Sequence, residues 1–308
     1  MFENSVAKST ALPTIAVTCG AAIWGIFWLP LRYIEGLGMS GLWAVVLASA
    51  VPLVILLPLL VWSFKQTRQQ LPIILLIALL SGGALTFYSI SLIHTTVVRA
   101  TLLFYLTPVW STTIGIFLLN ETVKWNRWAA IVCGLVGLYF IVGGFGQDSR
   151  EINIGDYFGL ASGLCWGLAG VLIKRNPDIG VTALASWQHL FAFLIALFCC
   201  LLITGVDQLP EYSIWLESVP VFTVYSWLGL VPSMFAIFWA SSRLFPGRVG
   251  ILMMTEVLVA VITAAWFLDE PVLLMEWFGV ILIVGAGVLE VVVGEQADDG
   301  GDSTNGSN

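Results

Sequence analysis

The sequence predicts an all-α integral membrane protein with ten transmembrane helices, arranged as two inverted five-helix repeats. Three observations support this prediction. Hydrophobic residues make up 59% of the 308 residues, charged residues only 10%, and the mean hydropathy is +0.96. A soluble domain carries about a quarter charged residues. Ten apolar runs follow one another along the chain, and two parts of the sequence align with each other without a gap.

The apolar runs have the length of membrane-spanning helices. An α-helix rises about 1.5 Å per residue, so about 20 residues cross a hydrocarbon core of roughly 30 Å. Short polar turns join the runs, which lie at 11–31, 40–63, 71–93, 99–119, 127–145, 156–173, 181–204, 219–241, 248–268 and 274–294. We divide the chain into a cytoplasmic N-terminal segment (1–11), a first repeat (12–145), an exterior linker (146–155), a second repeat (156–294) and a disordered acidic cytoplasmic tail (295–308).

The positions of Lys and Arg orient the chain, because basic residues are retained in cytoplasmic loops. With the N-terminus in the cytoplasm, nine of the twelve basic residues lie inside and three outside. The inner set is Lys8, Lys65, Arg68, Lys124, Arg127, Lys174, Arg175, Arg243 and Arg248, and the outer set is Arg32, Arg99 and Arg150. Both termini are therefore predicted to be cytoplasmic.

The internal repeat is clearest where residues 99–128 align with residues 248–277 at an offset of 149. This alignment matches Arg99 with Arg248, Glu121 with Glu270 and Trp128 with Trp277. Near the start of each half, Trp24 and Gly25 match Trp166 and Gly167 at an offset of 142. An odd number of helices in each repeat inverts the second copy. Inverted repeats are typical of secondary transporters, with a substrate site near the midplane.

Glu256 is the leading candidate functional residue, because it lies within an apolar run where the first copy has Thr107. A charge at such a depth costs roughly 2.5 kcal/mol or more, so the side chain must face protein or water. Removal from water favours the protonated form of a carboxyl group. Glu256 is thus a candidate for proton coupling; the alternative is a structural glutamate hydrogen-bonded to a neighbouring helix.

Other residues in the runs are candidates for lining a cavity between the first, fourth, sixth and ninth helices. Pro108 lacks an N–H group, so it kinks its helix or frees a carbonyl beside Thr107. For His189 we favour a single interhelical hydrogen bond over a proton relay with Glu256 or a hydrogen bond to a substrate. The full set of cavity candidates is Trp24, Tyr105, Thr107, Pro108, Trp166, His189 and Glu256, and packing is the alternative for each aromatic residue.

The two copies resemble a known paired signature. Leu106-Thr107-Pro108 leads to Leu119-Asn120-Glu121 in the first copy, and Thr255-Glu256-Val257 leads to Leu268-Asp269-Glu270 in the second. This pattern resembles the EamA family of the drug/metabolite transporter superfamily over residues 12–293. Two departures concern local helix geometry: Val257 replaces the expected proline, and Asn120 and Asp269 replace the commoner glycine. The resemblance implies a ten-helix permease, often an exporter of amino acids or other small metabolites.

We therefore expect a secondary transporter that exports amino acids or related metabolites by alternating access, with proton coupling through Glu256, in the bacterial inner (plasma) membrane. The alternatives are a passive facilitator and a membrane-embedded lipid-handling protein or enzyme. The sequence has no Walker loop, metal-ligand cluster or nucleophile elbow, so we expect no catalytic site, metal or cofactor. The expected partners are a small-molecule substrate and the lipid bilayer; the lack of a basic patch argues against nucleic acid.

A glycine series leaves one further question open. Gly159, Gly163 and Gly167 recur at every fourth residue, so they share one face of the sixth helix and let another helix approach closely. From the sequence, this face fits either packing inside the chain or a homodimer.

Overall fold

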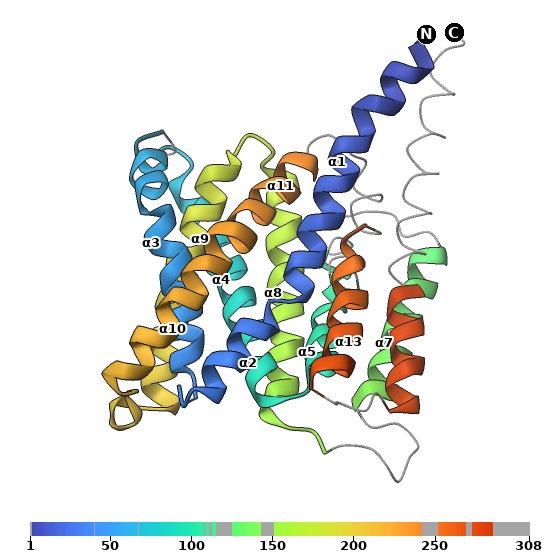
Figure 1. The fold of residues 1–308 in the computed structure, drawn as a ribbon. Coiled ribbons are helices and arrows are strands. Elements are labelled where there is room, and N and C mark those ends of the chain that lie inside the picture. The colour runs from blue at the N-terminus through green and yellow to red at the C-terminus, as the bar shows by residue number, and fades with distance from the viewer. Residues whose placement is uncertain are drawn as a thin grey trace, which may run out of the picture.

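The computed structural model describes residues 2–39, 41–66, 68–107, 109–110, 113–114, 125–142, 151–241, 252–268 and 273–285. Every regular element in these residues is helical, and helices lie in all ten predicted runs (Figure 1). Within the described residues, six segments are long and apolar enough to cross a membrane, and Thr255–Phe267 and Leu274–Gly285 are shorter apolar helices. The predicted all-α membrane fold is confirmed.

The helices follow the predicted order, and their bounds differ most at the starts of the first and eighth spans. Helix α1 begins at Phe2, so the polar N-terminal segment is helical, and the eighth span begins at Tyr212 rather than 219 because Glu217 is exposed and does not interrupt its helix. The elements are α1 (Phe2–Gly25), α2 (Trp28–Gly36), α3 (Trp43–Gln66), α4 (Leu71–His94), α5 (Val97–Phe104), α7 (Trp125–Val142), α8 (Ile154–Arg175), α9 (Val181–Ile203), η1 (Val206–Gln208), α10 (Tyr212–Tyr225), η2 (Ser226–Leu230), α11 (Val231–Ser241) and α13 (Thr255–Phe267).

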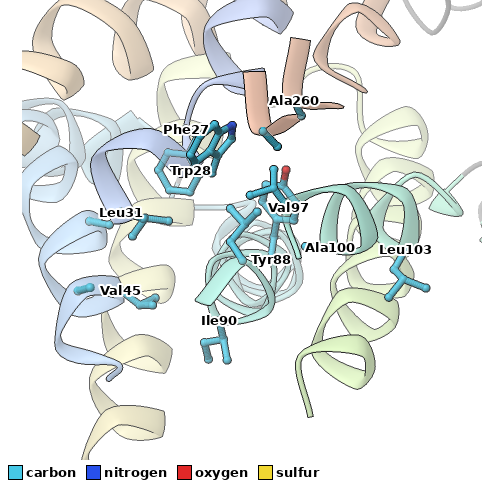
Figure 2. Close-up of a cluster of buried hydrophobic side chains, with 14 of the residues drawn as sticks. Phe27, Trp28, Leu31, Val45, Tyr88, Ile90, Val97, Ala100, Leu103 and Ala260 are labelled. Atoms are coloured by element: carbon cyan, nitrogen blue, oxygen red, sulfur yellow. The ribbon is translucent and has the colours of Figure 1, made fainter. Parts of the chain in front are cut away.

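The two halves of the chain interleave. Helix α4 packs against α8 and α9, α3 packs against α9, α1 packs against α11 and α13, and α5 packs against α8 and α13. Each of these pairs joins a helix of the first half to a helix of the second. Figure 2 shows part of the largest buried cluster, in which Trp28, Tyr88, Val97 and Ala260 come together from α2, α4, α5 and α13. The halves therefore share one core.

Glycines allow the closest contacts between the halves. A Cβ atom at Gly82 of α4 would lie 2.7 Å from the carbonyl oxygen of Gln188 in α9. Cβ atoms at Gly159 and Gly163 of α8 would lie 3.0 Å from Leu103 Cβ and 2.8 Å from the Phe104 carbonyl oxygen. Gly159 and Gly163 thus face α5 inside the chain. For these two residues, the structure therefore shows packing within the chain and not a homodimer face.

A buried ion pair joins α5 to α8 near the N-terminal end of each helix. Arg99 Nη2 lies 2.7 Å from Asp156 Oδ2, and both side chains are only 1% exposed. Asp156 also accepts hydrogen bonds from the Thr95 hydroxyl at 3.0 Å and from the Asn153 N–H at 3.0 Å, as part of the capping box of α8. Arg32 Nη2 donates to the Thr95 carbonyl at 3.1 Å. At this end, the two halves separate only if the pair breaks.

Replacement of Arg99 by alanine is expected to lower the free energy of unfolding by roughly 3–5 kcal/mol, because Asp156 is left as an uncompensated buried charge. The control is Glu35→Ala, which leaves the bond from Arg32 to Thr95 in place: Glu35 pairs with Arg32 at 3.1 Å, and these side chains are 32% and 26% exposed, so its loss is expected to cost less than about 1 kcal/mol. Equilibrium unfolding in mixed detergent micelles measures both. Equal small losses for the two variants contradict the assignment.

Two adjacent glycines of α4 provide a matched test of the interface with α9. Gly82→Ala is expected to destabilise the fold by roughly 1–3 kcal/mol, because the added methyl group meets the α9 backbone. Gly83→Ala is expected to be neutral or to stabilise by up to about 1 kcal/mol, since the nearest atom lies 3.7 Å away and alanine favours the helix. The thermal midpoints of the two variants check this difference. A lower midpoint for Gly83→Ala than for Gly82→Ala contradicts it.

Candidate functional site

Three of the spans are interrupted near the place where the halves meet. The first span breaks at Ile26 and Phe27, between α1 and α2. The fourth breaks at Tyr105, directly after α5, and the ninth breaks at Met254, directly before α13. Tyr105 and Met254 are equivalent at the offset of 149. Backbone groups freed by a break within a membrane must find partners in the protein or in a water-filled cavity.

The break in the first span lies against α13. Tyr225 donates its hydroxyl proton to the carbonyl oxygen of Ile23 at 2.7 Å, one turn before the break. A Cβ atom at Gly25 would lie 2.7 Å from the carbonyl oxygen of Glu256, so only glycine permits this approach. Beyond the break, Trp28 Nε1 donates to Thr263 Oγ1 at 3.1 Å. The break therefore brings α1 and α2 directly to the helix that carries Glu256.

The break in the fourth span is explained by a proline in the sequence. Pro108 lies outside the described residues, but a proline at this position has no N–H group to offer to Phe104, four residues earlier. The hydroxyl of Thr107 donates to the Phe104 carbonyl at 2.7 Å and lies 3.3 Å from the Gly163 carbonyl. A side-chain donor thus replaces the missing backbone donor, and Thr107 lies at the contact between α5 and α8.

The break in the ninth span has no proline, because Val257 is the residue equivalent to Pro108. Helix α13 begins at Thr255, so the N–H groups of its first three residues, Val257 included, have no acceptor within the helix. The Met253 carbonyl is left without its usual donor. It accepts instead from the hydroxyl of Tyr105 at 2.8 Å.

Glu256 lies directly beside this hydrogen bond. Its Oε2 atom is 2.8 Å from the Tyr105 hydroxyl oxygen, and the residue is only 3% exposed. In the part of the chain that the structure describes, Glu256 takes part in no ion pair. Among the described titratable side chains, Tyr105 contacts it, and its electrostatic influence also reaches Tyr88 and Tyr225. Glu256 is therefore a buried carboxyl group among tyrosines, with one polar side-chain contact.

The structure brings several of the predicted site residues together. Tyr105, Thr107 and Glu256 lie at the breaks in the fourth and ninth spans. Trp24 lies beside Gly25, and its ring centroid is 5.7 Å from that of Phe27. Trp166 is half-buried on α8, three residues after Gly163.

His189 lies in different surroundings. It is fully buried, and its Nδ1 atom is 2.9 Å from the carbonyl oxygen of Ala185 in its own helix, in place of the interhelical bond we favoured. Ala185, one turn earlier on the same face of α9, packs with Leu56 of α3 and Met234 of α11. Helix α13 packs mainly against α1 and α5. The described contacts therefore do not connect His189 with Glu256.

Sequence reasoning missed Tyr88 and Tyr225 as neighbours of Glu256, and it did not pair Arg99 with Asp156. The repeat drew attention to Arg99, but no sequence signal distinguished the two tyrosines from other aromatic residues. Within the described ranges, no group of three or more His, Cys, Asp or Glu side chains is placed to hold a metal ion. The chemistry that this arrangement offers is proton binding and hydrogen bonding at a helix break.

Comparisons with known proteins agree with this architecture. The model of the EamA-like transporter family matches residues 12–143 and 153–291. An uncharacterized transporter of Bacillus subtilis (strain 168), YoaV, is 26% identical over 284 residues, which cover 85% of this chain and 90% of that protein. An uncharacterized transporter of Archaeoglobus fulgidus is 26% identical over 205 residues, covering 66% of this chain and 69% of its own.

A further relative and a solved structure extend the comparison. An S-adenosylmethionine uptake transporter of Rickettsia bellii (strain RML369-C) is 29% identical over 124 residues, covering 40% of this chain and 42% of that protein. One crystal structure superposes with a TM-score of 0.60 at 16% identity, over 95% of this chain and 99% of the other, which shows a shared fold alone.

The family match covers both halves of the chain, at residues 12–143 and 153–291. The protein is thus a multi-pass integral membrane transporter and not an enzyme. With two copies of the family's domain, the chain belongs to the EamA-like transporter family.

Proposed function

We propose that this chain is a secondary transporter that exports amino acids or related metabolites by alternating access and exchanges them for protons at Glu256. One observation carries the proposal: Glu256 is buried at the break in the ninth span, in contact with Tyr105 at the equivalent break of the other half. A proton bound to this carboxyl group therefore lies at the contact between the two halves. Proton binding can then shift the equilibrium between two arrangements of the halves that bind the proton differently.

Alternating access requires that the halves close at one end while they open at the other. The buried Arg99–Asp156 pair supplies a contact suited to the closed end, because it joins α5 of the first half to α8 of the second. The distribution of Lys and Arg supports an exterior position for this end, with both termini cytoplasmic in a bacterial inner membrane. The position equivalent to Asp156, at the offset of 142, is Thr14, so the repeat provides no carboxylate at this position in the first half.

The choice of cargo class rests on the family and on one relative. The Rickettsia bellii relative takes up S-adenosylmethionine, which contains an amino acid moiety, and this supports amino acids and their derivatives as the cargo of the present chain. That relative works in the direction of uptake, whereas the family resemblance favours export. A homodimer remains a prediction; Gly159 and Gly163 do not form its face, because they pack against α5.

Purified protein in liposomes tests the proposal. Acid-loaded liposomes receive pooled labelled amino acids and metabolites, S-adenosylmethionine included, and wild type is compared with Glu256→Gln and with protein-free liposomes. Exchange of solute for protons predicts accumulation in the acidic interior, which a protonophore abolishes. Glu256→Gln is expected to lose this accumulation, because the amide does not release a proton.

The control variant is Glu276→Gln. Glu276 is also a buried carboxyl residue, but it accepts the Leu273 N–H at 2.9 Å at the start of another helix. An amide oxygen can accept the same bond, so this variant is expected to keep gradient-driven accumulation. Equilibration without accumulation, unchanged in Glu256→Gln, contradicts proton coupling and indicates a passive facilitator. Accumulation in alkaline-loaded liposomes instead indicates proton symport.

A further inference from the structure

Tyr105 has one hydroxyl proton and two oxygen atoms within hydrogen-bond distance. The Met253 carbonyl oxygen and Glu256 Oε2 each lie 2.8 Å from its hydroxyl oxygen. A carbonyl oxygen and an ionised carboxylate are both acceptors only. If Glu256 is ionised, one of these two contacts has no proton between its oxygen atoms. If Glu256 is protonated, it donates to Tyr105, Tyr105 donates to Met253, and both contacts are hydrogen bonds.

The two repeats supply a hydrogen-bond donor to the carbonyl group at the helix break in different ways. Met253 is equivalent to Phe104, and Glu256 is equivalent to Thr107, at the offset of 149. In the first repeat, Thr107 donates its own hydroxyl proton to the Phe104 carbonyl at 2.7 Å, whatever the pH. In the second repeat, Glu256 reaches the Met253 carbonyl only through Tyr105. Protonation of the carboxyl group therefore decides whether this carbonyl has a donor.

No other described side chain supplies the missing proton. Among the described residues, Tyr105, directly after α5, contacts Glu256, and the electrostatic influence of Glu256 also reaches Tyr88 of α4 and Tyr225 of α10; no described Lys, Arg or His pairs with it. Tyr225 donates to the Ile23 carbonyl at 2.7 Å, and the Tyr88 hydroxyl is paired with Thr101 at 3.1 Å. Helix α1 contributes backbone at Gly25, which offers no titratable side chain.

We propose that Tyr105 is a positioning residue that links protonation of Glu256 to the break before α13. When Glu256 is protonated, the Tyr105 hydroxyl donates to the Met253 carbonyl and holds the first turn of α13 in the observed conformation. When Glu256 releases its proton to water, the hydroxyl turns to the carboxylate, and the Met253 carbonyl loses its donor. Tyr105 keeps its own proton in both states. This inference rests on the proposed proton binding at Glu256.

Hydrogen–deuterium exchange of the peptide that contains residues 253–259 tests the inference, after correction for the intrinsic effect of pH on exchange. The Leu258 N–H in this peptide donates to the Met254 carbonyl at 3.3 Å, so it exchanges when the first turn of α13 opens. In wild type, exchange is expected to be roughly three- to tenfold faster at high pH than at low pH, the factor that one net hydrogen bond gives. Tyr105→Phe is expected to exchange fast at every pH. Glu256→Gln is expected to exchange slowly at every pH, because its amide group donates permanently to Tyr105.

Tyr225→Phe is the matched control, since Tyr225 also caps a carbonyl at a helix break but accepts no bond from a carboxyl group. It is expected to keep the wild-type dependence on pH. A dependence on pH that survives in Tyr105→Phe overturns the inference, and so does fast exchange in Glu256→Gln. If Tyr105→Phe does not fold, the comparison of exchange between wild type and Glu256→Gln at low and high pH tests the inference.

The exchange measurement uses no solute, so its result can contradict the role of Tyr105 without contradicting the proposed transport function, and the reverse. If exchange depends on pH in wild type and is locked in Glu256→Gln, the role of Tyr105 is supported even where liposomes accumulate no solute. If liposomes show gradient-driven accumulation that Glu256→Gln loses, but exchange at 253–259 does not depend on pH, the inference about Tyr105 is overturned and proton coupling stands.

Discussion

The structure depends on one constraint: a carbonyl group freed by a helix break inside a membrane needs a hydrogen-bond donor from the protein or from a cavity. Three spans of this chain break near one another, and a hydroxyl group meets each break. Tyr225 donates to Ile23, Thr107 donates to Phe104, and Tyr105 donates to Met253. Two of these hydroxyl groups reach across from another helix. The breaks are therefore part of the contact between the halves.

This constraint explains why the carboxyl group of Glu256 can be buried at the break in the ninth span. Glu256 is costly when it is ionised without a cationic partner, and no described cation pairs with it. In the protonated form it completes a chain of donors that ends on the Met253 carbonyl, for which the described residues offer no other donor. The same geometry makes the local backbone sensitive to the proton. A transporter needs such a link between an ion and a movable element, since a bound ion shifts only those equilibria whose states bind it differently.

Much of this arrangement could be predicted from the sequence. Composition and the spacing of apolar runs predicted the helices, and the offset of 149 matched the two breaks at Tyr105 and Met254. A lone carboxyl residue in an apolar run singled out Glu256. The second break itself was not predictable, because Val257 stands where proline would have marked it. The role of Tyr105 depends on a contact between residues 151 positions apart, and His189 turned to a face that periodicity does not identify.

The proton on Glu256 is the central claim, and infrared spectroscopy of the purified protein tests it most directly. A protonated carboxyl group has a carbonyl stretching band that an ionised carboxylate lacks. The account predicts such a band in wild type that disappears in Glu256→Gln and shifts in Tyr105→Phe, where one hydrogen bond is lost. Spectra of wild type and Glu256→Gln with no difference in this band, at any pH where the protein stays folded, would contradict the account.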